Sequence, residues 1–131
     1  MEERFDVRLH EAAEKEYNRL DGSVLEEVNN AIDELIYRAD EVGKKLSNHA
    51  QTKLAGCKEI KLRSAGIRIV FRVTNEIVDV LRIVHVLTIE KRTRDLAFTL
   101  AHKRLNTVRS IPKDQMRKYL EKLEQWKTRS R

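Results

Sequence analysis

The feature that most constrains the fold of this chain is an alternation of apolar and cationic side chains across residues 57–73. Apolar residues recur at every second position there, and cations occupy several of the positions between them. Successive side chains of a β-strand point to opposite faces, so this period of two predicts two strands, roughly 57–63 and 67–73, joined by a tight turn. The hairpin would gather four cations on or near one face of a sheet: Lys61, Arg63, Arg68 and Arg72.

Period and turn signals divide the rest of the chain into further elements. Alternation predicts a first strand over residues 5–9. Apolar residues three and four positions apart predict helices at 11–20, 23–39, 93–106 and from Pro112 onward. Ser23 followed by Glu26 is typical of a capping box at a helix start. After a turn at 74–76, the nearly continuous apolar run from Ile77 to Leu87 is typical of a central strand covered on both faces.

The order of these elements predicts an α+β fold. Strands and helices fall into separate runs rather than alternating along the chain. Three successive strands with short connections form an antiparallel meander, and the first strand joins it at an edge. We therefore expect a small antiparallel sheet of about four strands. The two N-terminal helices would pack on one face of this sheet, and C-terminal helices would complete the fold.

Length and composition favour one cytoplasmic domain. A chain of 131 residues with 40% apolar residues can bury a modest core. Its one cysteine, Cys57, excludes an internal disulfide and fits a reducing cytosol. We find no His and Cys pattern that suggests a metal site, no signal-peptide pattern and no apolar run long enough to cross a membrane. We expect no metal, no cofactor and no membrane partner.

The positive charge of the chain is concentrated near its C-terminal end. The net charge is +6, yet residues 1–90 hold 14 Lys and Arg against 17 Asp and Glu. Residues 91–131 hold 13 Lys and Arg against 4 Asp and Glu. Such a one-sided basic field favours nucleic acid or another acidic partner, although a solvated basic surface explains the charge equally well.

The hairpin and the residues after it resemble a known family. The matching elements are Cys57, the Ile60–Ser64 strand, Gly66-x-Arg68-x-Val70, the apolar strand 77–86, Lys91-Arg92-x-Arg94 and Ala101-x-x-Arg104-Leu105. On these elements the chain resembles the RelE/ParE superfamily of bacterial toxins, in particular its RelE branch, over about residues 5–105. The resemblance implies a RelE-like toxin domain at 1–106. Residues 107–131 would be a basic, amphipathic helical extension to which nothing carries over.

This resemblance implies a function. RelE toxins are described as ribosome-dependent mRNA endonucleases that cut codons in the ribosomal A site and are held inactive by a cognate antitoxin. The chain would accordingly be the toxin of a type II toxin-antitoxin system, and an endoribonuclease that inhibits translation. Cleavage would proceed by metal-independent attack of the ribose 2′-hydroxyl. Its partners would be an antitoxin protein, the ribosome and mRNA.

The resemblance also implies roles for individual residues. Lys61 matches a lysine that helps to activate the 2′-hydroxyl, and Arg68 matches an arginine that stabilises the scissile phosphate. Arg92 matches an arginine near the leaving group. The other cations of the hairpin and of the 91–94 segment are candidate RNA contacts: Arg63, Arg72, Lys91 and Arg94.

Two positions depart from the family pattern. Glu59 stands where well-studied members carry a lysine, and Phe98 stands where they carry a tyrosine that stacks on a base. A phenylalanine ring can still stack, but it has no hydroxyl to donate a proton. Glu59 leaves two alternatives open: the carboxylate acts as the base itself, or it pairs with Lys61 and weakens catalysis.

The sequence also leaves a second function open. His85 is a possible acid or base because its ordinary pKa lies near neutrality, but we favour a core histidine. Glu59 and Phe98 motivate the alternative of a non-catalytic binder with the RelE/ParE fold. Such a protein would inhibit DNA gyrase, or it would bind the ribosome with attenuated cleavage.

Overall fold

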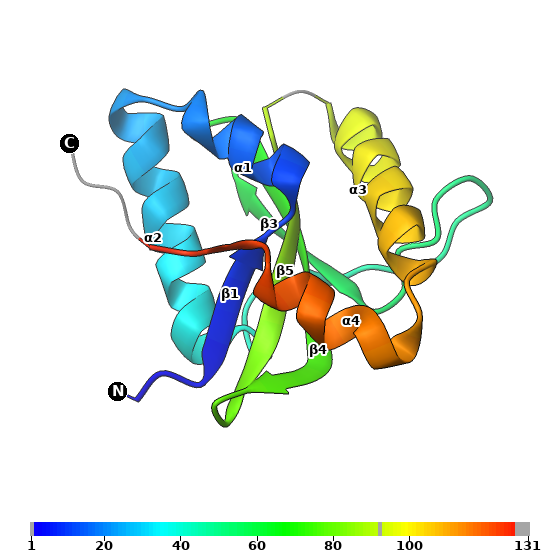
Figure 1. Ribbon diagram of the computed structural model, residues 1–131. Helices are drawn as coiled ribbons and strands as arrows, with labels where there is room; N and C mark the ends of the chain where they lie inside the picture. Colours follow the sequence, from blue (N-terminus) through cyan, green and yellow to red (C-terminus); the bar gives the residue numbers. More distant parts are fainter. Residues whose placement is uncertain (1, 92, 128–131) are drawn as a thin grey trace.

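The computed structural model describes residues 2–91 and 93–127, which form an α+β fold around one sheet (Figure 1). The strands are β1 (Phe5–Leu9), β2 (Lys44–Lys45), β3 (Cys57–Leu62), β4 (Ile67–Val78), β5 (Leu81–Glu90) and β6 (Glu124–Gln125). The helices are α1 (Glu11–Asn18), α2 (Gly22–Arg38), α3 (Arg94–Arg109) and α4 (Lys113–Glu121). The predicted fold class is confirmed.

The sheet differs in detail from the one predicted. In the described residues it has six strands in the order β2-β3-β4-β5-β1-β6, because the two-residue strands β2 and β6 add to its edges. It is also mixed, since β1 runs parallel to β5 from Phe5 opposite Arg82 to Leu9 opposite Val86. Alternation in a sequence indicates which side chains face a core, but it carries no information about strand direction. The sequence pattern therefore could not predict this parallel pair.

Strand β4 continues past the predicted turn at residues 74–76. The register between β4 and β5 shifts between Val73 and Ile77, so these residues form a bulge. The Thr74 hydroxyl stabilises the bulge by donating to the Ile83 carbonyl at 2.7 Å and accepting from the Glu76 amide at 3.1 Å. The chain reverses instead at residues 79–80, which both have positive φ, as in a two-residue hairpin loop. The predicted turn was wrong because side-chain hydrogen bonds keep those polar residues within the sheet.

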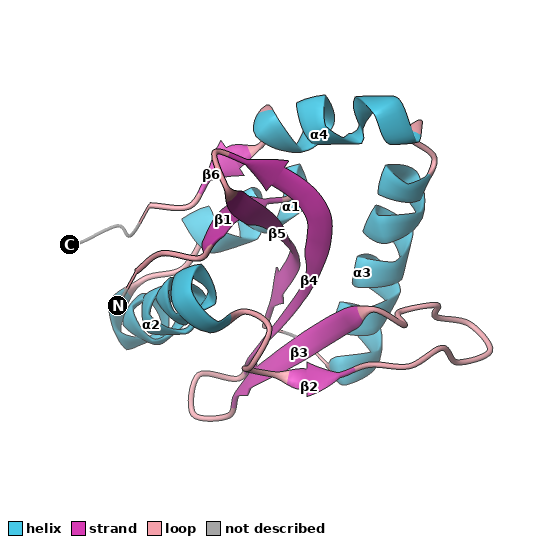
Figure 2. Cartoon of the chain, turned by 90° about the horizontal axis from the view of Figure 1, so that it is seen from below, coloured by secondary structure: helices cyan, strands magenta, loops and turns pink. Residues whose placement is uncertain are grey.

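Helices lie on both faces of the sheet (Figure 2), and the side chains packed between helices and sheet form two apolar layers. Apolar side chains of α1 and α2, such as Tyr17 and Ile32, pack against Ile69 and Phe71 on one face. On the other face, Ala101 and other residues of α3 pack against β-strand residues. The predicted packing of the two N-terminal helices on one face is confirmed. The predicted cap at Ser23 is wrong, since α2 begins at Gly22 with Asp21 as its N-cap.

A partly buried ion pair joins the two layers at the open edge of β5. Strand β1 ends opposite Val86, so the last residues of β5 lack a strand neighbour on that side. The carboxylate of Glu16 accepts the Ile89 amide at 3.0 Å and two hydrogen bonds from Arg104 at 2.8 and 2.9 Å. Arg104 also donates to the Leu87 carbonyl at 2.9 Å. These charge-assisted bonds position the end of β5, from which the chain continues to α3.

The C-terminal segment folds onto the sheet instead of forming one long helix. Helix α4 ends at Glu121, and β6 then pairs antiparallel with β1. Trp126 is 6% exposed, and its indole donates to Asp33 at 2.8 Å while its ring meets Tyr17 edge-on. The prediction of a helix continuing past Glu121 to Trp126 was wrong, because edge pairing and ring burial compete with helical propagation. The division into a domain at 1–106 and an extension at 107–131 stays a prediction.

Among the described helices, none has the length and hydrophobicity that crossing a membrane requires.

His85 lies at the centre of the sheet with no exposed surface. Its neighbours from the surrounding elements are Arg72 on β4, His10 before α1 with ring centroids 5.8 Å apart, and Tyr119 on α4 at 6.5 Å. Burial, with the like charges of Arg72 and His10, holds the pKa of His85 well below its usual value. This burial agrees with the interpretation of a core histidine.

We expect the free energy of unfolding to fall as the pH drops below about 6.5, the ordinary pKa of histidine. In that range His85 binds a proton in the unfolded chain but not in the folded one, so its stabilising effect is complete above this pH and declines below it. The free energy of unfolding should fall by at most about 1.4 kcal/mol for each pH unit through this group. Urea unfolding across this pH range measures it. The slope of the free energy of unfolding against pH should decrease in His85→Leu and persist in His49→Gln. An unchanged slope in His85→Leu would contradict the prediction.

Candidate functional site

Among the described residues, four cations line an open hollow where the β3–β4 hairpin faces the start of α3. The hollow has a volume of about 410 Å³ and is lined by Lys61, Leu62, Arg63, Gly66, Ile67, Arg68, Thr93 and Arg94. We call it the cationic cavity. Three of its cations come from the hairpin and one from α3, so residues distant in sequence meet there. A hollow with this charge suits the phosphate groups of a nucleic acid.

Backbone geometry positions the cationic cavity. Lys61 lies directly opposite Arg68 in the antiparallel register of β3 and β4, so both side chains share one face. Gly66 closes the hairpin turn with φ +68°, a conformation that glycine adopts readily. On the facing side, the Thr93 hydroxyl accepts the Leu96 amide at 3.3 Å and caps the start of α3. The cap places Arg94 in the first turn of α3.

Glu59 supplies a buried negative charge beside this cavity. The residue is 3% exposed, and its carboxylate accepts a hydrogen bond from Arg68 at 3.1 Å. The Lys61 ammonium lies 4.0 Å from the other carboxylate oxygen. Both cations keep part of their side chains exposed, 26% for Arg68 and 34% for Lys61. Glu59 therefore orients the two candidate catalytic cations and offsets part of their charge.

Arg72 lies apart from the other hairpin cations. It faces Cys57 at the far end of β3, and its Nε and Nη2 atoms are buried without a hydrogen-bond partner. Burial, aided by the charge of Arg109, lowers the pKa of Arg72. The expectation that all four hairpin cations form one surface is therefore corrected: Lys61, Arg63 and Arg68 meet in the cationic cavity, and Arg72 does not. Its charge interacts instead with residues of the helices on this face, Arg109 of α3 and Tyr119 of α4.

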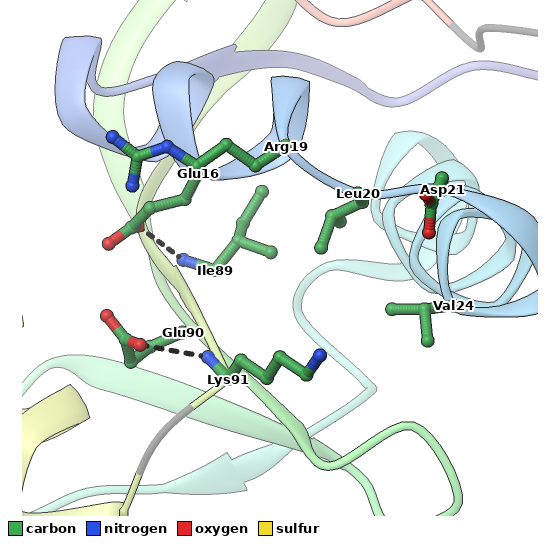
Figure 3. Close-up of a pocket in the computed structure, with 8 residues that line it drawn as sticks. All are labelled: Glu16, Arg19, Leu20, Asp21, Val24, Ile89, Glu90 and Lys91. Carbon is green, nitrogen blue, oxygen red and sulfur yellow. Dashed lines mark hydrogen bonds between the residues drawn. The ribbon is translucent and has the colours of Figure 1, made fainter.

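Lys91 lines a different hollow, of about 540 Å³, on the side of α1 and α2 (Figure 3). The residues drawn there are Glu16, Arg19, Leu20, Asp21, Val24, Ile89, Glu90 and Lys91. The Glu90 carboxylate accepts a hydrogen bond from the Lys91 backbone amide at 3.0 Å, directly after the end of β5. The charged side chains that line this hollow are both acidic and basic, whereas the charged side chains that line the cationic cavity are all basic. Arg92, predicted to lie near the leaving group, falls outside the described residues.

Phe98 and His85 are both buried. Phe98 is 7% exposed and packs in the core under α3, and the Arg94 guanidinium lies 5.2 Å from the centre of its ring. Its stacking on a base stays a prediction. His85, fully buried, has no surface through which to meet a substrate. The described residues contain no group of three or more His, Cys, Asp or Glu side chains placed to hold a metal ion.

Comparison with known proteins finds solved structures with a similar fold. No family model matches the chain, and no curated protein matches it. Among solved structures, a free variant of the E. coli toxin RelE with two arginines replaced by alanine is 27% identical. The match covers 79% of this chain and 99% of that one, with a TM-score of 0.58. The intact E. coli RelBE toxin-antitoxin complex matches at 28% identity and a TM-score of 0.51, covering 69% of this chain and 99% of that one.

The chain belongs to the RelE/ParE superfamily of toxins. A YoeB/ParE toxin from Agrobacterium tumefaciens shares the fold at 18% identity, with 68% of this chain and all of that one covered and a TM-score of 0.51. Nearly the whole length of each neighbour is represented here.

For this RelE/ParE chain, the sequence analysis did not predict two interactions that position the elements around the site: the Thr93 cap of α3 and the Glu16–Arg104 ion pair. The Thr93 cap was detectable, because a threonine directly before an apolar stripe is a usual helix start. The Glu16–Arg104 pair, separated by 88 positions, had no local signal. Such long-range pairs become visible only when the chain is folded.

Substitution of Glu59 by glutamine should strengthen RNA binding. Glu59→Gln keeps the shape of the side chain but removes the charge that offsets Lys61 and Arg68. We expect the dissociation constant for single-stranded RNA to fall severalfold and the dependence of binding on salt to steepen. Fluorescence anisotropy against salt concentration measures both. Glu26→Gln on the exposed surface of α2 is the matched control for net charge; equal affinities in the two variants would contradict the role given to Glu59.

Proposed function

We propose that this chain is the toxin of a type II toxin-antitoxin system and cleaves mRNA in the ribosomal A site. The observation that carries the proposal is the cationic cavity, where Lys61 and Arg68 face each other across the hairpin and Arg63 and Arg94 also line the hollow. A cluster of cations without a bound polyanion is electrostatically costly, so its presence favours a phosphate ligand. The RelE structures that the chain resembles support the toxin assignment.

The proposed reaction uses the nucleophile that RNA itself carries. The 2′-oxygen attacks the adjacent phosphorus, a bond forms between them, and the bond from phosphorus to the 5′-oxygen breaks. The neutral amine form of Lys61 takes the proton of the 2′-hydroxyl, and Arg68 donates hydrogen bonds to the phosphate oxygens as negative charge develops. Arg92, outside the described residues, is the predicted contact near the 5′-oxygen that gains a proton. This scheme requires cations and in-line geometry rather than a metal ion.

A ribosome would supply the geometry that free RNA lacks. The 2′-oxygen must lie in line with the leaving oxygen, and flexible single strands seldom hold that arrangement. The cationic cavity is an open hollow at the end of a hairpin, a shape that suits an RNA strand presented by a larger partner. Ribosome dependence thus agrees with the shape of the site and with the resemblance to RelE.

The proposed antitoxin would neutralise the cationic cavity. A solved neighbour is a toxin-antitoxin complex, which supports a protein partner of this kind. An acidic or helical segment laid across Lys61, Arg63 and Arg94 would block RNA and remove the repulsion among these cations.

A non-catalytic binder is the second candidate. The observation that favours it is Glu59, whose carboxylate holds Arg68 at 3.1 Å and approaches Lys61. A cation engaged by a buried carboxylate is less available to a phosphate. The chain would then inhibit DNA gyrase or occupy the ribosome without efficient cleavage.

We expect Lys61→Ala and Arg68→Ala each to reduce cleavage by about 100-fold or more, as is typical when a preorganised charge is removed. The measurement is primer-extension mapping of mRNA after induced expression, together with growth arrest. Arg38→Ala, an exposed arginine of α2 that pairs only with the exposed Glu34 side chain among the ion pairs of the described residues, is the control and should cut like the wild type. Undiminished cleavage in both cavity variants would remove them from the catalytic site.

The two candidate functions differ in their target. Purified protein should cut mRNA bound to ribosomes and leave the DNA supercoiling by gyrase unchanged. Parallel assays with ribosomes and with gyrase measure this. Trapping of gyrase on DNA without mRNA cuts would overturn the nuclease and support the second candidate.

A further inference from the structure

A second hollow, which we call the loop cavity, lies beside α3. The loop between β2 and β3 projects next to this helix in both views (Figures 1 and 2). Between the loop and the first turns of α3 is a hollow of about 470 Å³. The loop contributes His49, Gln51 and Thr52 to its wall, and the helix contributes Arg94, Asp95 and Phe98.

Hydrogen bonds hold the loop against α3. The His49 amide donates to the Thr52 carbonyl at 2.8 Å, which closes a tight turn at the loop tip. The Lys53 amide donates to His102 Nδ1 at 2.9 Å, and Arg109 donates to the Lys53 carbonyl at 3.1 Å. Both partners lie on α3. The wall of the loop cavity is therefore a preorganised structure rather than a free segment.

The loop cavity adjoins the cationic cavity. Arg94 lines both cavities, so the two hollows share one side chain as part of their walls. A ligand could therefore place neighbouring groups in the two cavities. The Arg94 guanidinium also lies 5.2 Å from the centre of the Phe98 ring. A planar base in the loop cavity would lie near both the guanidinium and the aromatic ring, since both residues line it.

The two cavities differ in charge. The four cations of the cationic cavity suit a phosphate, whereas the loop cavity balances Arg94 with the Asp95 carboxylate. The other polar side chains that line it are the amide of Gln51, the imidazole of His49 and the hydroxyls of Thr52 and Thr99, each of which can donate and accept hydrogen bonds. Single-stranded RNA is recognised in this way, by stacking on aromatic or guanidinium planes and by hydrogen bonds to base edges.

We propose that the loop cavity binds the nucleobase next to the cleaved phosphate and that Gln51 and His49 read its edge. The inference rests on the proposed nuclease function and names the residues that would set its sequence preference. Gln51 supplies both a donor and an acceptor to the base edge. Asp95 accepts from an exocyclic amino group.

The test is the cut preference of the full chain on ribosomes programmed with mRNAs randomised in the A-site codon. We expect Gln51→Ala and His49→Ala to flatten the preference at one nucleotide position by about fivefold or more, the usual range for losing a base-edge contact. Ser47→Ala is the matched control, since Ser47 is exposed in the same loop and is not part of the cavity wall. Unchanged preference in both cavity variants would overturn the proposal while leaving the nuclease function intact.

A second measurement separates this inference from the nuclease function. Fluorescein-labelled oligo(A), oligo(C), oligo(G) and oligo(U) are titrated with wild type and Gln51→Ala. A base preference that Gln51→Ala removes supports the loop cavity even if the wild type cuts no mRNA. Absence of both cutting and base preference overturns both proposals. A Gln51→Ala variant that loses affinity only for a purified antitoxin overturns this one and makes the loop a protein-docking surface.

Discussion

The register of the β3–β4 hairpin is the constraint on which the rest of this structure depends. By placing Lys61 opposite Arg68 and Cys57 opposite Arg72, it puts these side chains on one face of the sheet, opposite the face that α1 and α2 cover. A slip by one residue would turn the apolar set outward and the cations into the core. The core of α1, α2 and the sheet holds this register, so packing energy on one face maintains the charge arrangement on the other.

Glu59 shows how the site can be stable and still bind an anion. Lys61 and Arg68 repel each other, and a buried carboxylate beneath them offsets this repulsion in the free protein. The same carboxylate competes with any phosphate that enters. Stability of the free protein and affinity for the proposed RNA ligand would thus be opposed at this one residue.

Most elements of the fold followed from local patterns, and the failures have physical causes. Helix and strand types were predictable because periods of 3.6 and 2 reflect burial directly. The bulge at Thr74, the end of α4 at Glu121 and the parallel β1–β5 pair were not, since each depends on partners far along the chain. At the site, Lys61, Arg63 and Arg68 came from the alternation, whereas the enclosure of two Arg72 nitrogen atoms, near Arg109 and Tyr119, depends on distant helices.

By itself, the sequence determined the α+β class, the cationic hairpin and the family, because these depend on local period and on residues close together in the chain. Only the tertiary structure decided that Arg94 joins the hairpin cations, that Arg72 leaves them and that Glu59 is buried against two of them. It also brought the 46–56 loop against α3 through His102 and Arg109. Such features depend on where distant segments meet, and a linear pattern of side chains does not encode that meeting point directly.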